Sequence, residues 1–171
     1  VGANERQQLD TLGPADVKIV IEMGDIGSAS CDRINEAIPK GRAAAPAHRA
    51  TLEKMRRALR EWLLTTRDAG FLTEPQIWER LGAAGTPLDL ARDDAKYPLA
   101  RLLDAADLVG RVEAVPQQMQ LLRDADDGVR YWAALGLLIR GQAAVESARD
   151  GLVNRLDDQS PSVRIVAARA L

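Results

Sequence analysis

Two segments of the chain are variants of one pattern: LRDADDGVRYWAALGL at residues 122–137 and LDDQSPSVRIVAARAL at residues 156–171. They are offset by 34 residues along their whole length. A period of this size, with a helix, an acidic turn and a second helix in each unit, is typical of an all-α fold of the α-solenoid type. Because each unit has an apolar face that it cannot bury alone, such units stack on their neighbours.

The turn and the second helix of each copy have recognisable local chemistry. Ser160 is a favoured N-cap residue, and Pro161 suits the first helical position, where its missing N–H costs no hydrogen bond. Apolar residues then recur at every fourth position: Val129, Ala133 and Leu137 in the first copy, and Val163, Ala167 and Leu171 in the second. We therefore predict a helix after each acidic turn, with small alanines that let neighbouring helices approach closely.

The two copies share an aspartate, four variable residues, Val-Arg, two variable residues and Ala-Ala. This pattern, within residues of about 116–171, resembles the HEAT repeat family. The resemblance implies a HEAT-like α-solenoid in which the turn acid and the arginine form a ladder between adjacent repeats. Here the ladder would pair Arg130 or Arg164 with Asp124 or Asp158. From the residues alone, solvated charges beside a turn are the alternative interpretation.

A second resemblance lies upstream, in the segments LEKMRRALREW at 52–62, TRDAGFL at 66–72, GTP at 85–87 and DDAKYP at 93–98. Residues of about 47–110, which contain these segments, resemble the C-terminal helical tail of some bacterial arylsulfatase-like proteins. In those proteins the tail can run on into HEAT repeats. The resemblance implies an accessory domain of a sulfatase-like hydrolase, although the first 46 residues do not fit that context.

The chain divides by sequence into three parts. Residues 111–171 hold the two HEAT-like repeats, the second shortened, and residues 46–110 form the region that resembles the sulfatase tail. Residues 1–45 are an N-terminal segment, for which one HEAT-like helical pair is one interpretation. Within it, the β-branched residues of 17–23 favour a strand. The repeat context favours a helix at the same place, so both alternatives stay open.

Local signals predict several helix boundaries. A helix that starts at Ser28 is expected to end at Ile38, before Pro39, and residues 41–46 are expected to be a linker. Two short helices have N-terminal signals, a capping box at Thr73 to Gln76 and a cap followed by proline at Thr86.

Composition limits the class of protein. Hydrophobic residues make up 46% of the 171 residues and charged residues 28%, which is typical of a globular chain rather than a disordered one. Aromatic residues are only 4%, which favours helices over a β-sandwich. The net charge is −2, so the overall charge gives no reason to expect binding to nucleic acid or to an anionic membrane. We expect a soluble, cytoplasmic protein, because no apolar run is long enough to span a bilayer.

The chain has few residues that are suited to catalysis or to metal binding. Cys31 is the only cysteine and His48 the only histidine. Cys31 lacks the sulfatase nucleophile motif, Cys or Ser, any residue, Pro or Ala, any residue, Arg. The acidic clusters at 93–94, 124–127 and 157–158 precede predicted helix starts, where capping accounts for them, and none has EF-hand spacing. We therefore predict a non-enzyme without catalytic residues, metal site or cofactor.

A helical-repeat module without catalysis would act in protein–protein interaction or as a scaffold. Binding would use the face formed by the second helices, with Arg130, Trp132 and Arg164 as candidate contacts. Trp62, Trp78 and Trp132 fall at apolar helical spacings, which favours a role in packing.

Two further expectations concern partners. Arg56, Arg57 and Arg60 form a basic helix surface, as nucleic-acid-binding helical repeats have, but neighbouring acidic residues neutralise it and no aromatic residue is interleaved. Nucleic acid is therefore the less favoured alternative. The last helix, residues 163–171, carries an apolar edge, which predicts self-association as a dimer through the C-terminal helix.

Overall fold

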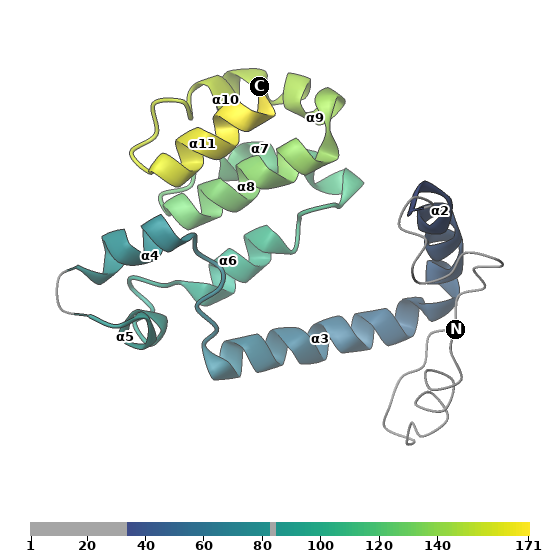
Figure 1. Cartoon of the computed structure of the whole chain (residues 1–171), viewed down its shortest axis with the longest axis horizontal. Coiled ribbons are helices and arrows are strands. Elements are labelled where there is room, and N and C mark those ends of the chain that lie inside the picture. The colour runs from purple at the N-terminus through teal and green to yellow at the C-terminus, as the bar shows by residue number, and fades with distance from the viewer. Residues whose placement is uncertain (1–33, 83–84) are drawn as a thin grey trace. The chain divides into compact units, whose positions relative to one another are not determined.

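The computed structural model describes residues 34–82 and 85–171, and all regular secondary structure within them is helical (Figure 1). Contacts divide the chain into two compact units, Val1–Leu59 and Arg60–Leu171. The segment of residues 17–23, for which helix and strand are both open, lies outside the described residues.

The described part of the first unit corrects two expected boundaries. Helix α2 spans Ile34–Ala44 and contains Pro39, so the helix does not end at Ile38. The expected linker is helical as well, because α2 runs on through Gly41 and is followed by the 3₁₀ helix η2, Ala45–His48. Alanine is the best helix former, and Ala43 and Ala44 favour the continuation of α2 past the single hydrogen bond that Pro39 removes.

The second unit begins within α3, Arg49–Thr66, and its remaining helices are α4 (Glu74–Leu81), α5 (Pro87–Ala91), α6 (Leu99–Ala106), η3 (Val112–Ala114), α7 (Val115–Leu121), α8 (Asp127–Arg140), α9 (Gln142–Ser147), α10 (Arg149–Val153) and α11 (Pro161–Ala170). Helix α8 is central, because α6, α7, α9 and α11 all pack on it, while α10 packs on α11 (Figure 1). The sequence repeat therefore corresponds to two successive helical pairs, α7–α8 and α10–α11.

Helix starts follow the predicted capping signals with one exception. The backbone N–H of Thr73 donates to Gln76 Oε1 at 3.0 Å, as a capping box requires. Thr86 accepts from the backbone N–H of Asp89 at 3.3 Å and caps α5. Ser160 does occupy the N-cap position of α11, but its hydroxyl makes no capping hydrogen bond. The prediction at Ser160 is therefore right in position and wrong in mechanism.

Two buried clusters form the core of the second unit, and α8 contributes to both. One cluster gathers residues from α4 to α6 around Tyr97 and Leu102, and Val129 at the start of α8 completes it. The other gathers residues from the two helical pairs, with Ala133 and Leu137 of α8 at its centre. A boundary near residue 110 therefore does not separate two cores, because the first cluster draws residues from both sides of it.

The contact between α7 and α8 requires a glycine. A Cβ atom on Gly136 of α8 would lie 2.0 Å from Nε2 of Gln118, which is fully buried in α7. That Nε2 donates to the backbone carbonyl of Leu108 at 3.1 Å, so Gln118 cannot move away without losing a hydrogen bond.

Candidate interaction surface

The two acidic turns have the same hydrogen bond at equivalent positions. Oδ1 of Asp124 accepts from the backbone N–H of Asp126 at 2.8 Å, and Oδ1 of Asp158 accepts from that of Ser160 at 3.0 Å. Aspartate favours such turns because its side chain can bond the backbone two residues further on. The 34-residue sequence repeat is therefore also a repeat of local geometry.

In each copy an arginine lies six positions after the turn aspartate, and its side chain hydrogen-bonds back to that turn. Nη1 of Arg130 donates to the backbone carbonyl of Asp124 at 2.9 Å, and Nη1 of Arg164 donates to that of Asp158 at 2.7 Å. Each also donates to the next carbonyl of its turn at 3.0 Å. In both copies the arginine thus supplies donors to carbonyl oxygens that no helix satisfies.

Arginines also connect successive helical pairs. Nη2 of Arg101, in α6, lies 2.6 Å from Oδ1 of Asp124, in the turn before α8. Arg130, in α8, binds Asp158 in the turn before α11 with two parallel hydrogen bonds, at 2.8 Å from Nε and 2.7 Å from Nη2. Of the pairings that the HEAT resemblance implies, the structure contains Arg130 with Asp158. The side chain of Arg164 forms no ion pair with any residue that the structure describes.

The pair of Arg130 and Asp158 is buried, with side chains that are 11% and 1% exposed. Burial by itself would raise the pKa of Asp158, but hydrogen bonds from Arg130 and the backbone of Ser160, and the charges of Arg130 and Arg155, outweigh it and lower the pKa. The pair is therefore charged at neutral pH. Removing one member of a buried pair leaves an uncompensated charge, which makes this contact important for joining α8 to the next turn.

A second ionic cluster joins α4 to the start of α8. Arg80 donates from Nη1 and Nη2 to the carboxylate of Asp126 at 3.1 and 3.0 Å, and it also binds Asp127. Nε2 of Gln76 donates to Asp127 Oδ2 at 2.5 Å. Burial alone would raise the pKa of Asp127, but the charge of Arg80 and hydrogen bonds from Gln76 and Arg80 lower it. Sequence analysis did not identify Arg80, because its partners lie 46 and 47 residues away.

The structure gives the three predicted contact residues different environments. Arg130 is held by Asp158, so little of its side chain is left for a partner. Trp132 donates from Nε1 to the carbonyl of Phe71 at 2.9 Å, and its ring lies 6.0 Å from that of Phe71. Both are therefore packing residues. Arg164 is partly buried and is bonded to its own turn.

The packing role predicted for the tryptophans holds only for Trp132. Trp62 and Trp78 are both more than half exposed, so their predicted burial is wrong. Apolar spacing places a residue on a face of its helix, but it does not show whether another element covers that face. Trp78 does donate from Nε1 to Glu74 Oε1 at 3.3 Å, within its own helix.

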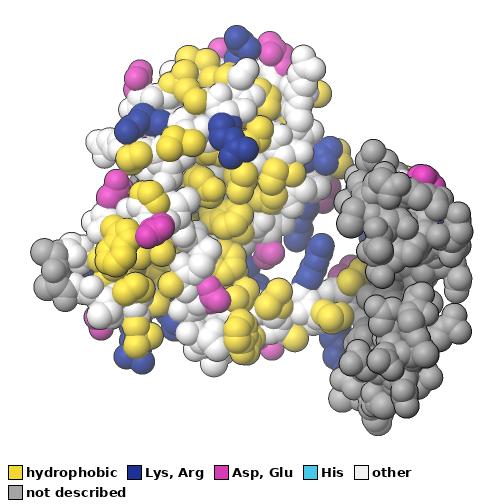
Figure 2. All heavy atoms as spheres, viewed as in Figure 1, with side chains coloured by type: hydrophobic (Ala, Val, Ile, Leu, Met, Phe, Trp, Pro, Cys, Tyr) yellow, Lys and Arg dark blue, Asp and Glu magenta, His cyan; other side chains and the backbone are white. Residues whose placement is uncertain are grey.

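A shallow groove of about 200 Å³ lies between α8, α11 and the start of α4, and its main lining residues are Thr73, Tyr131, Leu135, Ser162, Ile165 and Arg169. The hydroxyls of Thr73 and Ser162 lie 2.6 Å apart and join α4 to α11 at one end of the groove. Ile165 is 62% exposed beside it. Figure 2 shows hydrophobic side chains gathered on this face of the molecule, over α8 and α4.

The groove residues also follow the 34-residue repeat. Tyr131 and Ile165 are equivalent in the 34-residue repeat, and so are Leu135 and Arg169. Each pair is spaced by four residues along its own helix, which places both members on one face. The same repeat that predicts the core positions thus also marks the outer face of the second helices.

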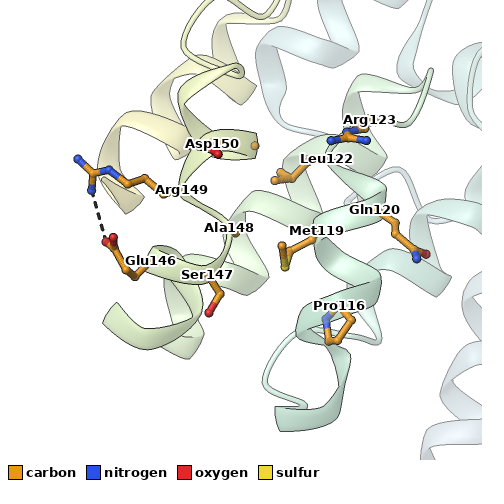
Figure 3. A pocket seen from close by; sticks show the side chains of 11 residues that line it. Pro116, Met119, Gln120, Leu122, Arg123, Glu146, Ser147, Ala148, Arg149 and Asp150 are labelled. Atoms are coloured by element: carbon orange, nitrogen blue, oxygen red, sulfur yellow. Dashed lines mark hydrogen bonds and ion pairs between the residues drawn. The ribbon is translucent and has the colours of Figure 1, made fainter.

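A larger hollow, of about 570 Å³, lies on the side of the first helices, between α7 and the segment that joins α9 to α10. Figure 3 shows Met119 and Leu122 from α7 and its end facing Ala148 and Asp150. Arg123 and Asp150 both line the hollow, so its rim carries both signs of charge. The hollow therefore favours no one charge class of ligand.

Of the two residues considered for catalysis, the structure describes only His48. Cys31 lies outside the described residues, and His48 ends the short helix η2. Within the described ranges, 34–82 and 85–171, no three His, Cys, Asp or Glu side chains are grouped as metal ligands would be.

The basic surface expected from α3 is reduced by ion pairs. Arg60 contacts Asp104 at 2.6 Å and Asp107 at 3.0 Å, both on or just after α6. Its charge is therefore shared with two carboxylates rather than offered to a phosphate backbone.

Among the helices of the described residues, none is both long and apolar enough to cross a bilayer. Comparison of the chain with models of known protein families, with curated proteins and with solved structures finds no match.

Proposed function

We propose that the chain is a HEAT-like α-solenoid module without catalytic activity, which binds a protein partner on the face formed by α8 and α11. The observation that carries this proposal is the groove beside Ile165, a large apolar side chain that is 62% exposed. Apolar surface is costly in water, and removing it from water contributes about 25 cal/mol for each Å², against the entropic cost of association. Apolar side chains in pockets at the centre of an interface often supply most of its affinity.

The charge of the groove indicates the chemistry of the partner. Among the described residues that line it, Arg169 alone carries a charge. An amphipathic helix with apolar residues three or four positions apart and a nearby carboxylate would complement this surface. The repeated turns and the bond between Arg130 and Asp158 support the HEAT-like arrangement, because they join one helical pair to the next as neighbouring repeats require.

The proposal can be tested with a displayed library of helical peptides selected against the whole chain. We expect enriched peptides to combine apolar positions at helical spacing with Asp or Glu. Replacing Ile165 by Glu should weaken their binding roughly tenfold or more, because the variant places a charge at the anchor position.

Val153→Glu is the matched control, since Val153 is 45% exposed on α10 and does not line the groove. Its affinity for the selected peptides should equal that of the unmodified chain. Peptides that bind both variants equally well would contradict the proposed face.

The absence of catalysis has its own test. We expect no hydrolysis of aryl sulfate, phosphate or carboxylate esters above the background rate, because the sequence lacks the sulfatase nucleophile motif and has a single imidazole. Turnover that disappears on His48→Ala or Cys31→Ala would refute this part of the proposal.

A further inference from the structure

The turns and second helices of the two pairs can be compared position by position, because the repeated segments 122–137 and 156–171 cover them. Three apolar residues of α7–α8 are buried, whereas their counterparts 34 residues later are exposed: Leu122 and Leu156, Ala134 and Ala168, Leu137 and Leu171. Leu122 is 1% exposed against 38% for Leu156, and Leu137 is fully buried against 42% exposure for Leu171. Since the residues are alike, the difference comes from what covers them.

The structure shows what covers the first set. A Cβ atom on Gly151 of α10 would lie 2.9 Å from Cδ1 of Leu122, so a residue without a side chain sits directly against that leucine. Ala134 and Leu137 share their cluster with Val166 and Ala167 of α11. The element that buries these residues is thus the helical pair α10–α11, which has a small residue in its first helix and small or β-branched residues in its second.

The same helical pair also supplies a carboxylate to Arg130. Asp158, in the turn of the covering pair, binds Arg130 with two hydrogen bonds. Arg164 is the counterpart of Arg130, and it reproduces the bonds of Arg130 to its own turn. No carboxylate among the residues of the described ranges pairs with it. Arg164 therefore keeps the donors with which Arg130 binds the next turn.

We propose that the edge formed by Leu156, Arg164, Ala168 and Leu171, the α10–α11 edge, docks one further helical pair, which carries an aspartate in the turn between its helices. The aspartate pairs with Arg164, a small residue of the first helix lies against Leu156, and the second helix covers Ala168 and Leu171. The docked pair would contact α11 in the way that α11 contacts α8, so the stack would grow by one helical pair. This surface is separate from the groove beside α4, and the inference does not rest on the proposed binding there.

A second copy of the chain is a poorer occupant. The interface between the two helical pairs is heterologous, because it joins two different surfaces. Two α10–α11 edges that met about a two-fold axis would bring like surfaces together, and each Arg164 would lack the turn aspartate that Arg130 has. The C-terminal dimer expected from sequence is therefore an alternative that the experiment must separate.

The experiment supplies a helical pair of the stated chemistry by fusing a copy of residues 138–171 directly after Leu171, which preserves the 34-residue period. If the added pair docks, the extended chain unfolds in urea in a single transition, with a steeper denaturant dependence because more surface is exposed on unfolding. Arg164→Ala should reduce the folding equilibrium constant roughly tenfold more in the extended chain than in the original one. Replacing the added copy of Asp158 by Asn should remove that extra effect.

Arg111→Ala is the matched control, since Arg111 is exposed in the turn before η3 and should have the same effect in both chains. Two separate unfolding transitions, or an equal effect of Arg164→Ala in both chains, would overturn the proposal. Sedimentation of the original chain tests for the C-terminal dimer. We expect a monomer at low and high concentration. A dimer that Leu171→Glu returns to monomer would assign the edge to a second copy and overturn the proposal as well.

Discussion

The helical pairs α7–α8 and α10–α11 share one sequence pattern in their turns and second helices, yet they differ in how much of their surface is covered. Their acidic turns and the arginine bonds to those turns agree closely. Their outer residues do not, because α7–α8 has a neighbouring pair against it. Local geometry in this protein is therefore set by short-range sequence, whereas burial at the same position of the pattern depends on the neighbour.

The largest expected effect comes from truncating a leucine that one pair buries and the other exposes. Leu137→Ala should lower the free energy of unfolding by about 3 kcal/mol, because it leaves a cavity in the second core cluster. Leu171→Ala should cost less than about 1 kcal/mol, since Leu171 is already partly in water. Urea unfolding of the two variants checks the comparison, and equal losses would contradict the difference in burial between the two leucines.

The next effect concerns the two arginines of the pattern. Arg130→Ala should cost about 2–3 kcal/mol, because it leaves Asp158 buried with only Arg155 and a backbone N–H as partners. Arg164→Ala should cost about 1 kcal/mol or less, since it removes only hydrogen bonds to carbonyl oxygens of a surface turn. Thermal unfolding at neutral pH separates the two outcomes. A larger loss for Arg164→Ala would mean that the ion pair of Arg130 and Asp158 does not hold the two helical pairs together.

Larger side chains at equivalent alanines should destabilise the covered pair more than the exposed one. Ala134→Phe overfills a fully buried position and should cost about 1–3 kcal/mol. Ala168→Phe, at the equivalent exposed position, should stay within about 0.5 kcal/mol. Circular dichroism melting curves of both variants measure the difference. Similar melting temperatures would contradict the assigned repeat register.

The smallest expected effect depends on pH. Because the pKa of Asp158 is lowered in the folded state, its charge stabilises the fold above the unfolded pKa, near 3.9, and this contribution is lost as pH falls through the folded value. Asp158→Asn should therefore be less stable than the unmodified chain at neutral pH, with a difference that shrinks as the solution becomes strongly acidic. Unfolding midpoints across this range provide the measurement. A difference that stays constant down to the lowest pH would exclude the charge of Asp158 as its source.

The sequence predicted features that arise from neighbouring residues in the chain. The capping box at Thr73, the cap at Thr86 and the start of α11 after Ser160 are present, because caps involve residues only three or four positions apart. The predicted helix end before Pro39 is wrong, since the helix-favouring alanines beyond it continue α2 past one lost hydrogen bond.

Sequence reasoning failed for contacts between distant segments. Arg80 reaches Asp126 and Asp127, and Arg101 reaches Asp124, from helices outside the repeat. No spacing rule identifies such partners, because the path of the chain between them decides which charges meet.

The sequence by itself determined that the chain is helical in the part described, where α8 and α11 begin after their acidic turns, and that the apolar face of each helix points inward at Val129, Ala133, Val163 and Ala167. These properties depend on backbone hydrogen bonds and side-chain periods that span a few residues. The tertiary structure alone decided that Trp132 is packed while Trp78 is exposed, and that Arg130 binds a carboxylate while Arg164 does not. Burial and charge pairing depend on which surfaces come together in space, and identical residues have different environments when only one of them has a neighbour.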